Sequence, residues 1–137
     1  MTLTPVSRAA TAGLRRARVG DRVPPEVLDR TRARRLEATA LVVPGAPPLD
    51  GYLAALDRSA RAFADWDGRV ATVAADGADG HRVLVVDRYG QIYDVVDGTE
   101  ATDLPAPDAL EEWFRFLATA CPECGVIDDP VLRGPTP

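Results

Sequence analysis

The sequence predicts a single α/β domain built around a mixed β-sheet. The chain has 137 residues, 46% of them hydrophobic, which is enough for one buried core and too little for two full domains. Short apolar segments typical of buried strands alternate with segments whose apolar residues recur at helical spacing. Two of the strand segments are separated only by a short turn, which indicates a β-hairpin.

The first predicted strand covers residues 38–43, which are apolar and contain several β-branched side chains. Prolines and a glycine within residues 44–48 end this strand. A helix is expected next, because apolar residues then recur every three or four positions and form one buried stripe. This stripe contains Leu49, Leu53, Leu56, Ala60 and Phe63.

Three further strands and a helix complete the expected core. Residues 69–75 form a buried strand that ends in the glycine-containing turn of residues 76–80. Residues 83–87 and 91–96 form a hairpin whose turn requires a positive φ at Gly90. A last helix begins at Pro107, a residue suited to a first helical position. We therefore expect a central mixed sheet of about four strands, flanked by helices.

The two ends of the chain are expected to lie outside this core. Residues 1–18 form a basic, Arg-rich N-terminal extension that can be flexible, and residues 126–137 form an irregular tail. A short helix is expected within residues 26–37. Residues 1–40 carry nine arginines and four acidic residues, whereas residues 41–137 carry seven and seventeen. Opposite charges should therefore draw the two parts of the chain together.

Composition and charge also bear on location and partners. No apolar run approaches the roughly 20 residues of a membrane span, and residues 1–20 lack the apolar centre of a signal peptide. We therefore expect a cytoplasmic protein. The clustered arginines could neutralise the phosphates of a nucleic acid, but no aromatic residue lies among them to stack on bases, so a nucleic-acid partner is not favoured.

The order of strand, helix, strand, hairpin and final helix resembles the thioredoxin fold. Two motifs resemble its peroxiredoxin and redoxin branch: Val19-Gly20-Asp21-Arg22-Val23-Pro24 is similar to the opening motif of that branch, and residues 83–93 are similar to its hairpin. The segment of residues 104–124 is similar to the end of a bacterial redoxin-like subgroup. The resemblance covers residues 19–125 and implies a thioredoxin-like domain over that range.

The resemblance does not extend to the residues that carry the family's chemistry. In that family a reactive cysteine follows the first core strand, at a helix N-terminus that stabilises its thiolate. Peroxiredoxins have a proline, then Thr or Ser four residues later, then Cys three further on. If Pro44 is that proline, Pro48 and Gly51 occupy the Thr and Cys positions. His81 and Arg82 stand where redoxins place a proline before the third core strand. The resemblance thus implies an inactive redox site.

The two cysteines of the chain, Cys121 and Cys124, lie in the segment Cys121-Pro122-Glu123-Cys124-Gly125. Turns of this type hold Zn or Fe, but two thiolates are half of a four-ligand site, so a metal would need a symmetric dimer or a partner. His81 could add a ligand. The pair could also be a redox dithiol, although the end of the preceding helix disfavours a thiolate, or it could be a structural turn. These alternatives stay open.

Other candidate sites have simpler interpretations. The Asp and Gly residues of 76–80 offer oxygen ligands but lack the length and the terminal Glu of an EF-hand loop, so a turn is expected. Asp87 and Asp94 could form a carboxylate pair on the hairpin, although no base or pocket accompanies them. Trp66 and Trp113 are expected to belong to the core.

The sequence as a whole favours a non-catalytic accessory, assembly or complex subunit that acts through protein–protein contacts, with a partner protein or as a homodimer. Two alternatives use the same pair of thiols: a thiol–disulfide oxidoreductase or redox sensor through Cys121 and Cys124, and a homodimer bridged by metal through these residues.

Overall fold

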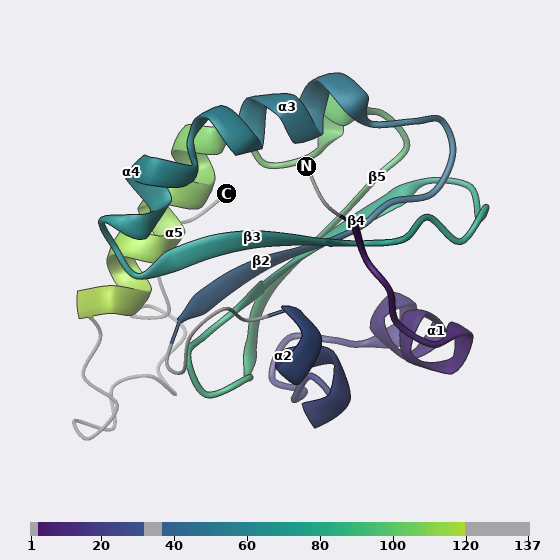
Figure 1. Ribbon diagram of the computed structural model, residues 1–137, viewed down its shortest axis with the longest axis horizontal. Helices are drawn as coiled ribbons and strands as arrows, with labels where there is room; N and C mark the ends of the chain where they lie inside the picture. The colour runs from purple at the N-terminus through teal and green to yellow at the C-terminus, as the bar shows by residue number, and fades with distance from the viewer. Residues whose placement is uncertain (1–2, 32–36, 120–137) are drawn as a thin grey trace.

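The computed structural model describes residues 3–31 and 37–119 (Figure 1). Its centre is a five-stranded sheet in the order β1-β3-β2-β4-β5. Strands β1, β3 and β2 run parallel, whereas β4 is antiparallel to β2 and β5 is antiparallel to β4. The strands are β1 (Leu3–Thr4), β2 (Ala38–Val43), β3 (Gly68–Val73), β4 (His81–Val86) and β5 (Ile92–Gly98). The sheet is therefore mixed, as expected.

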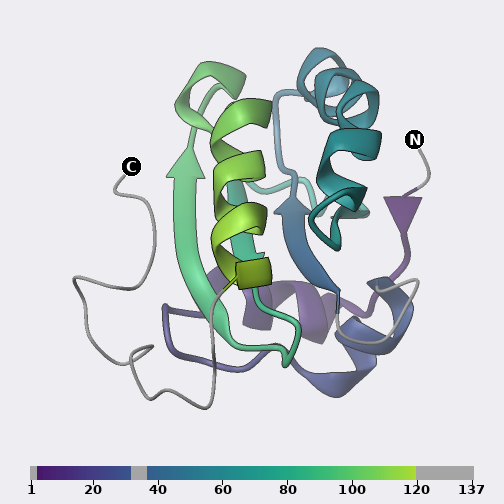
Figure 2. The same ribbon diagram turned by 90° about the vertical axis from the view of Figure 1, so that its left-hand side faces the viewer.

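Helices cover both faces of the sheet (Figures 1 and 2). Helices α3, α4 and α5 lie on one face, and α1 and α2 lie on the other. The helices are α1 (Arg8–Arg16), α2 (Pro25–Thr31), α3 (Asp50–Arg58), α4 (Ala60–Ala64), the 3-10 turn η1 (Ala101–Asp103) and α5 (Pro107–Thr119). Within the described ranges, no helix has both the length and the apolar character needed to cross a membrane.

The core under α3, α4 and α5 is built around two aromatic rings. Phe63 and Phe114 are fully buried and meet edge to face, with their ring centroids 5.1 Å apart. A Cβ atom on Gly68 would overlap the ring of Phe114, so this strand has to begin with glycine for α5 to lie this close. Val83 and Val85 of β4 supply the sheet side of this core.

The core on the opposite face explains why the chain before β2 is part of the fold. Leu14 of α1 and Val27 of α2 are fully buried, and they pack with the β2 side chains Leu41 and Val43. Because side chains alternate along a strand, β2 serves both cores and is buried throughout, which is why its sequence is continuously apolar.

Two expectations about the sheet and its extension need correction. The sheet has five strands and not about four, because Leu3 and Thr4 pair in parallel with Thr72 and Val73 of β3. The expected basic extension, residues 1–18, is packed structure where it is described: β1 completes the sheet, and α1 buries Leu14 against it. Two-residue strands carry no periodicity, so the sequence alone gives no signal for β1.

Most of the core elements follow the sequence pattern closely. Strand β2 and the start of α5 at Pro107 are confirmed at the predicted residues. The hairpin turn is confirmed as well: Gly90 has a φ of 90°, and the Asp87 carboxylate accepts the backbone N–H groups of Tyr89 and Gln91. The helix expected over residues 49–63 is interrupted at Ser59, whose hydroxyl donates to the Ala55 carbonyl oxygen.

Candidate functional site

A pocket of about 550 Å³ opens at the edge of the sheet where the parallel strands end. Since β1, β2 and β3 run in the same direction, their carboxyl ends reach this edge together, and open α/β sheets commonly bind ligands there. The walls come from Leu3 of β1, from the β2–α3 loop, from one side of α3 and from Ala75 after β3. Its volume lies in the range of typical ligand sites.

The pocket is mainly apolar, with charges at one side. Leu3, Leu49 and Leu53 line it, together with prolines of the β2–α3 loop. The charged lining residues Asp50, Asp57 and Arg58 all belong to α3 and are exposed. Among the described residues, the lining contains no cysteine, serine, threonine, histidine or lysine. The described lining can therefore bury an apolar group, and Asp50 and Asp57 are carboxylates in it that could accept a proton.

The positions singled out by the redoxin resemblance meet at this pocket. Pro44 and Pro48 line it, and Gly51 lies next to the lining residue Asp50 in the first turn of α3. Gly51 is exposed, and a Cβ atom added there would meet nothing within 4 Å. The position that corresponds to the reactive cysteine of redoxins is therefore an unobstructed glycine next to a lining residue of the pocket.

The β2–α3 loop is held in place by the loop between β3 and β4. The Ala46 N–H donates to the Ala78 carbonyl oxygen at 2.8 Å, and the Gly80 N–H donates to the Ala46 carbonyl oxygen at 3.0 Å. A Cβ atom on Gly45 would overlap the carbonyl oxygens of Ala78 and Gly80. The two loops therefore approach so closely that only glycine fits at this position.

His81, the first residue of β4, fastens the same loop from inside the protein. Its side chain is 2% exposed, and its Nδ1 accepts the Gly45 N–H at 3.0 Å. A ring nitrogen that accepts is unprotonated, so the proton of the neutral ring lies on Nε2, which has no partner among the described residues. Burial, and then the positive charge of Arg15, lower the pKa of His81 below its usual 6.5.

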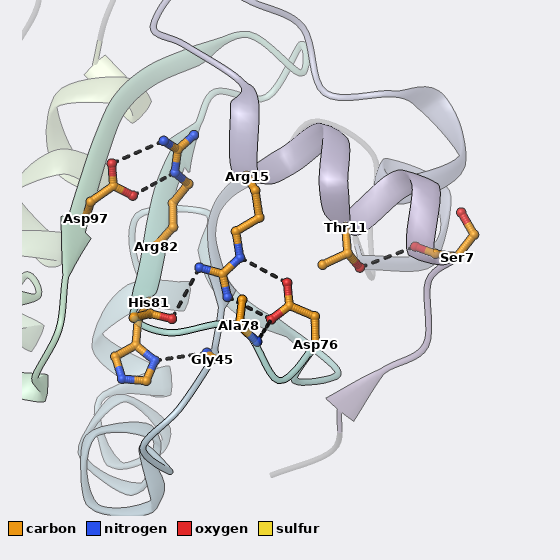
Figure 3. A network of polar contacts seen from close by, with 10 residues as sticks. Ser7, Thr11, Arg15, Gly45, Asp76, Ala78, His81, Arg82 and Asp97 are labelled. Carbon is orange, nitrogen blue, oxygen red and sulfur yellow. Dashed lines mark hydrogen bonds and ion pairs between the residues drawn. The ribbon is translucent and has the colours of Figure 1, made fainter.

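An arginine of α1 connects the helix to the same pair of loops (Figure 3). Arg15 makes two hydrogen bonds to the Asp76 carboxylate, at 2.9 and 3.1 Å, and a third to the Gly80 carbonyl oxygen. The Arg15 hydrogen bond is the main reason why the pKa of Asp76 lies below its ordinary value. The Asp76 carboxylate also accepts the Ala78 N–H, so the segment forms the turn that was expected.

A second arginine secures the other end of α1. Arg82 donates two hydrogen bonds to the Asp97 carboxylate, at 2.8 and 3.1 Å. Its remaining terminal nitrogen donates to the carbonyl oxygens of Leu14 and Ala17, at the C-terminal end of α1. The Leu14 oxygen also accepts the Ala17 N–H at 3.4 Å, so Arg82 adds a second donor there, and a cation at the C-terminal end of a helix is favourable. Arg15 and Arg82 together bind α1 to the sheet.

Those of the remaining sequence candidates that lie within the described residues do not come together in a site. Cys121 and Cys124 lie outside the described residues. Over the part of the chain that is described, no three His, Cys, Asp or Glu side chains gather where they could hold a metal ion. Asp87 and Asp94 do not face each other, because Asp94 is opposite Val85 while Asp87 shapes the turn.

The two tryptophans and Asp94 lie against the core. Trp113 is buried, and Trp66 packs against the same core while partly exposed, as expected. Burial raises the pKa of Asp94, an effect opposed by a backbone hydrogen bond and then by a hydrogen bond from the Trp113 side chain. The carboxylate is thus part of the packing between β5 and α5.

Comparison of the chain with family models, curated proteins and solved structures finds no match.

The sequence identified some of the segments that line the pocket, although it did not predict the pocket itself. The break in the chain at Pro44–Pro48 and the apolar positions Leu49 and Leu53 were visible in the sequence, and they form most of the pocket. The contribution of Leu3 was not visible, because it depends on a strand pairing with Thr72. His81 was considered as a metal ligand, whereas its hydrogen bond to Gly45 depends on the folded loop.

Proposed function

We propose that this protein is a thioredoxin-like domain of the redoxin type that has lost its nucleophile and acts as a binding or assembly subunit. The arrangement of elements supports this proposal. Parallel strands β2 and β3 are joined through helices α3 and α4, and the antiparallel hairpin β4–β5 and the final helix α5 follow. This is the order of elements that the resemblance implied.

The observation that carries the proposed function is the pocket beside Gly51. It has the size of a ligand site and an apolar lining, and its described lining residues include no thiol, hydroxyl or imidazole. A redoxin that kept the groove but not the cysteine would retain binding and lose chemistry. The pocket is therefore the surface through which we expect the protein to contact its partner.

The lining indicates the chemistry of the partner segment. An apolar side chain of a partner protein would be buried against Leu49 and Leu53, with a gain of about 1.5–3 kcal/mol for full burial. Asp50 and Asp57 lie on the exposed side of the pocket, where they favour a basic residue next to that apolar side chain. The partner can be another protein or a second copy of this chain.

Site-specific photo-crosslinking in the native organism tests this proposal. A photoreactive residue at Asp57, in the pocket lining, should capture one defined partner, whereas the same residue at the exposed Glu112 of α5 should not. Filling the pocket by Ala54→Trp should abolish the capture. The matched control is Ala64→Trp, an exposed alanine of α4 outside the pocket. Equal capture from both crosslinker positions, or capture that survives Ala54→Trp, would contradict the proposal.

A further inference from the structure

The β2–α3 loop, which lines the pocket, is fastened by three hydrogen bonds of two different kinds. Two join backbone groups of Ala46 to Ala78 and Gly80, and these groups do not titrate. The third joins the Gly45 N–H to the Nδ1 of His81. Imidazole is the side chain whose charge ordinarily changes near neutral pH, so this third bond is of the kind that a modest change in pH can break.

His81 cannot take up a proton and keep its bond to Gly45. In the neutral ring, Nδ1 accepts from Gly45 and Nε2 carries the proton, so a second proton has to go to Nδ1. The protonated Nδ1 would then point a donor at the Gly45 N–H, which is also a donor. The ring has to move away from Gly45, or Gly45 from the ring, for the charged form to exist.

The charged groups around His81 do not relieve this conflict. Arg15 of α1, which donates to the carbonyl oxygen of the preceding Gly80, repels a positive imidazolium. The Asp76 carboxylate of the β3–β4 loop is already occupied by two hydrogen bonds from Arg15. Asp79, in the same loop, is exposed and lies in a backbone bridge with Ala46.

The carboxylates on the other elements near His81 likewise already accept hydrogen bonds from other groups. On β5 its strand neighbour is Gly98, and the adjacent Asp97 accepts both of its hydrogen bonds from Arg82. Asp103 of η1, whose Cβ lies close to Gly98, accepts the backbone N–H groups of Thr99 and Glu100.

We propose that His81 is a pH-sensitive latch on the pocket: protonation of its ring releases Gly45 and loosens the β2–α3 loop, so that partner binding weakens in mild acid. The effect on binding rests on the proposed function, whereas the release of the loop does not. The latch acts on the wall of the pocket that contains Pro44, Gly45 and Pro48.

The pH range of the effect follows from the direction of the shift. The latched state holds the His81 pKa below 6.5, and a released, solvated ring titrates near 6.5. Below pH 6.5 the released state therefore binds a proton that the latched state does not. The ratio of released to latched loop should rise by up to about tenfold for each pH unit below 6.5. Above pH 6.5 the latch stays closed.

Nuclear magnetic resonance of the whole chain can measure both the protonation of His81 and the loosening of the β2–α3 loop. His81 is the sole histidine of the sequence, so a labelled imidazole reports its titration without ambiguity. Amide exchange at Gly45 and Ala46, corrected for intrinsic rates, should accelerate as the pH falls from about 7.5 to about 5.5. The Leu53 amide, bonded to Leu49 within α3, is the internal control and should keep its protection. Titration of His81 without faster exchange at Gly45 would overturn the latch.

A variant and a binding measurement complete the test. In His81→Asn the side-chain oxygen can accept from Gly45 but does not titrate, so exchange and crosslinking from Asp57 should both become independent of pH. If the wild-type loop loosens while partner capture stays constant with pH, the control of binding is refuted. If the loop loosens and Asp57 captures no partner at any pH, the proposed function fails while the latch stands.

Discussion

Replacing Gly45 by alanine should separate the β2–α3 loop from the β3–β4 loop. The new Cβ atom would overlap the carbonyl oxygens of Gly80 and Ala78 and would lie 2.9 Å from Nη2 of Arg15. The arginine can shift, but the two oxygens belong to backbone that is hydrogen-bonded to this very loop. The strain can therefore be relieved only by moving one loop away from the other.

The protein can accommodate the methyl group in two ways, and the cost of each limits the expected loss of free energy of unfolding. Keeping the loops together costs about 1–3 kcal/mol, as overpacking in tight sites does. Moving them apart instead sacrifices the two bonds of Ala46 and the bond from Gly45 to His81, each worth about 0.5–1.5 kcal/mol. Because the protein adopts the less costly arrangement, we expect the free energy of unfolding to fall by about 1–3 kcal/mol.

Urea unfolding, followed by the fluorescence of Trp66 and Trp113, measures this loss. With a slope of about 1–3 kcal/mol per molar urea, the midpoint should fall by roughly 1–2 M. Gly51→Ala is the matched control: its Cβ meets open space within α3, so the variant should be more stable by about 0.5–1 kcal/mol. The reasoning is refuted if Gly45→Ala unfolds within about 0.5 kcal/mol of the wild type.

Three further predictions concern the rest of the molecule. Arg82→Met should lower the free energy of unfolding by about 1–2 kcal/mol in thermal denaturation, because the Ala17 oxygen loses the Arg82 donor and the Leu14 oxygen keeps only the Ala17 N–H. Arg115→Met, an exposed change, should have almost no effect. The pKa of Asp94 is raised in the folded protein, so its protonated form favours folding at low pH, and this stabilisation is lost as the pH rises above about 4. Asp94→Asn should therefore have a higher melting temperature than the wild type at pH 7 and a smaller advantage near pH 4. An equal difference at both pH values would contradict this. A metal-bridged dimer through the C-terminal thiols should contain about half a metal per chain and become monomeric with chelator or as Cys124→Ser; metal-free monomers would exclude the bridge, and absence of a reducible disulfide would exclude the dithiol enzyme.

The parts of the fold that were predictable are those whose signal is local. Strand β2 is apolar throughout because both of its faces are buried, and Pro44 directly after it ends it in any context. Helix α5 combines a proline start with a regular apolar stripe that ends in the buried Leu117. In each case a run of neighbouring residues carries the whole pattern, so no knowledge of distant contacts was needed.

The parts that were missed depend on residues far apart in the chain. Leu3 looks like an isolated apolar residue until it pairs with Thr72. The interruption at Ser59 was hidden, since the apolar spacing continues from α3 into the buried Phe63 of α4. His81 was named from the sequence as a possible metal ligand. Its hydrogen bond to Gly45 joins the start of β4 to the loop after β2, and no spacing in the sequence indicates that contact.

Strand β1 also constrains the order in which the molecule can form. Leu3 and Thr4 are synthesised long before Thr72 and Val73, the residues with which they pair. Helix α1 differs in this respect, because its buried Leu14 also packs with Leu41 and Val43 of the earlier strand β2. Pairings of high sequence separation form slowly, and the apolar surface that awaits them stays open to unwanted association. Strand β1, although made early, is thus secured only after β3 has been synthesised.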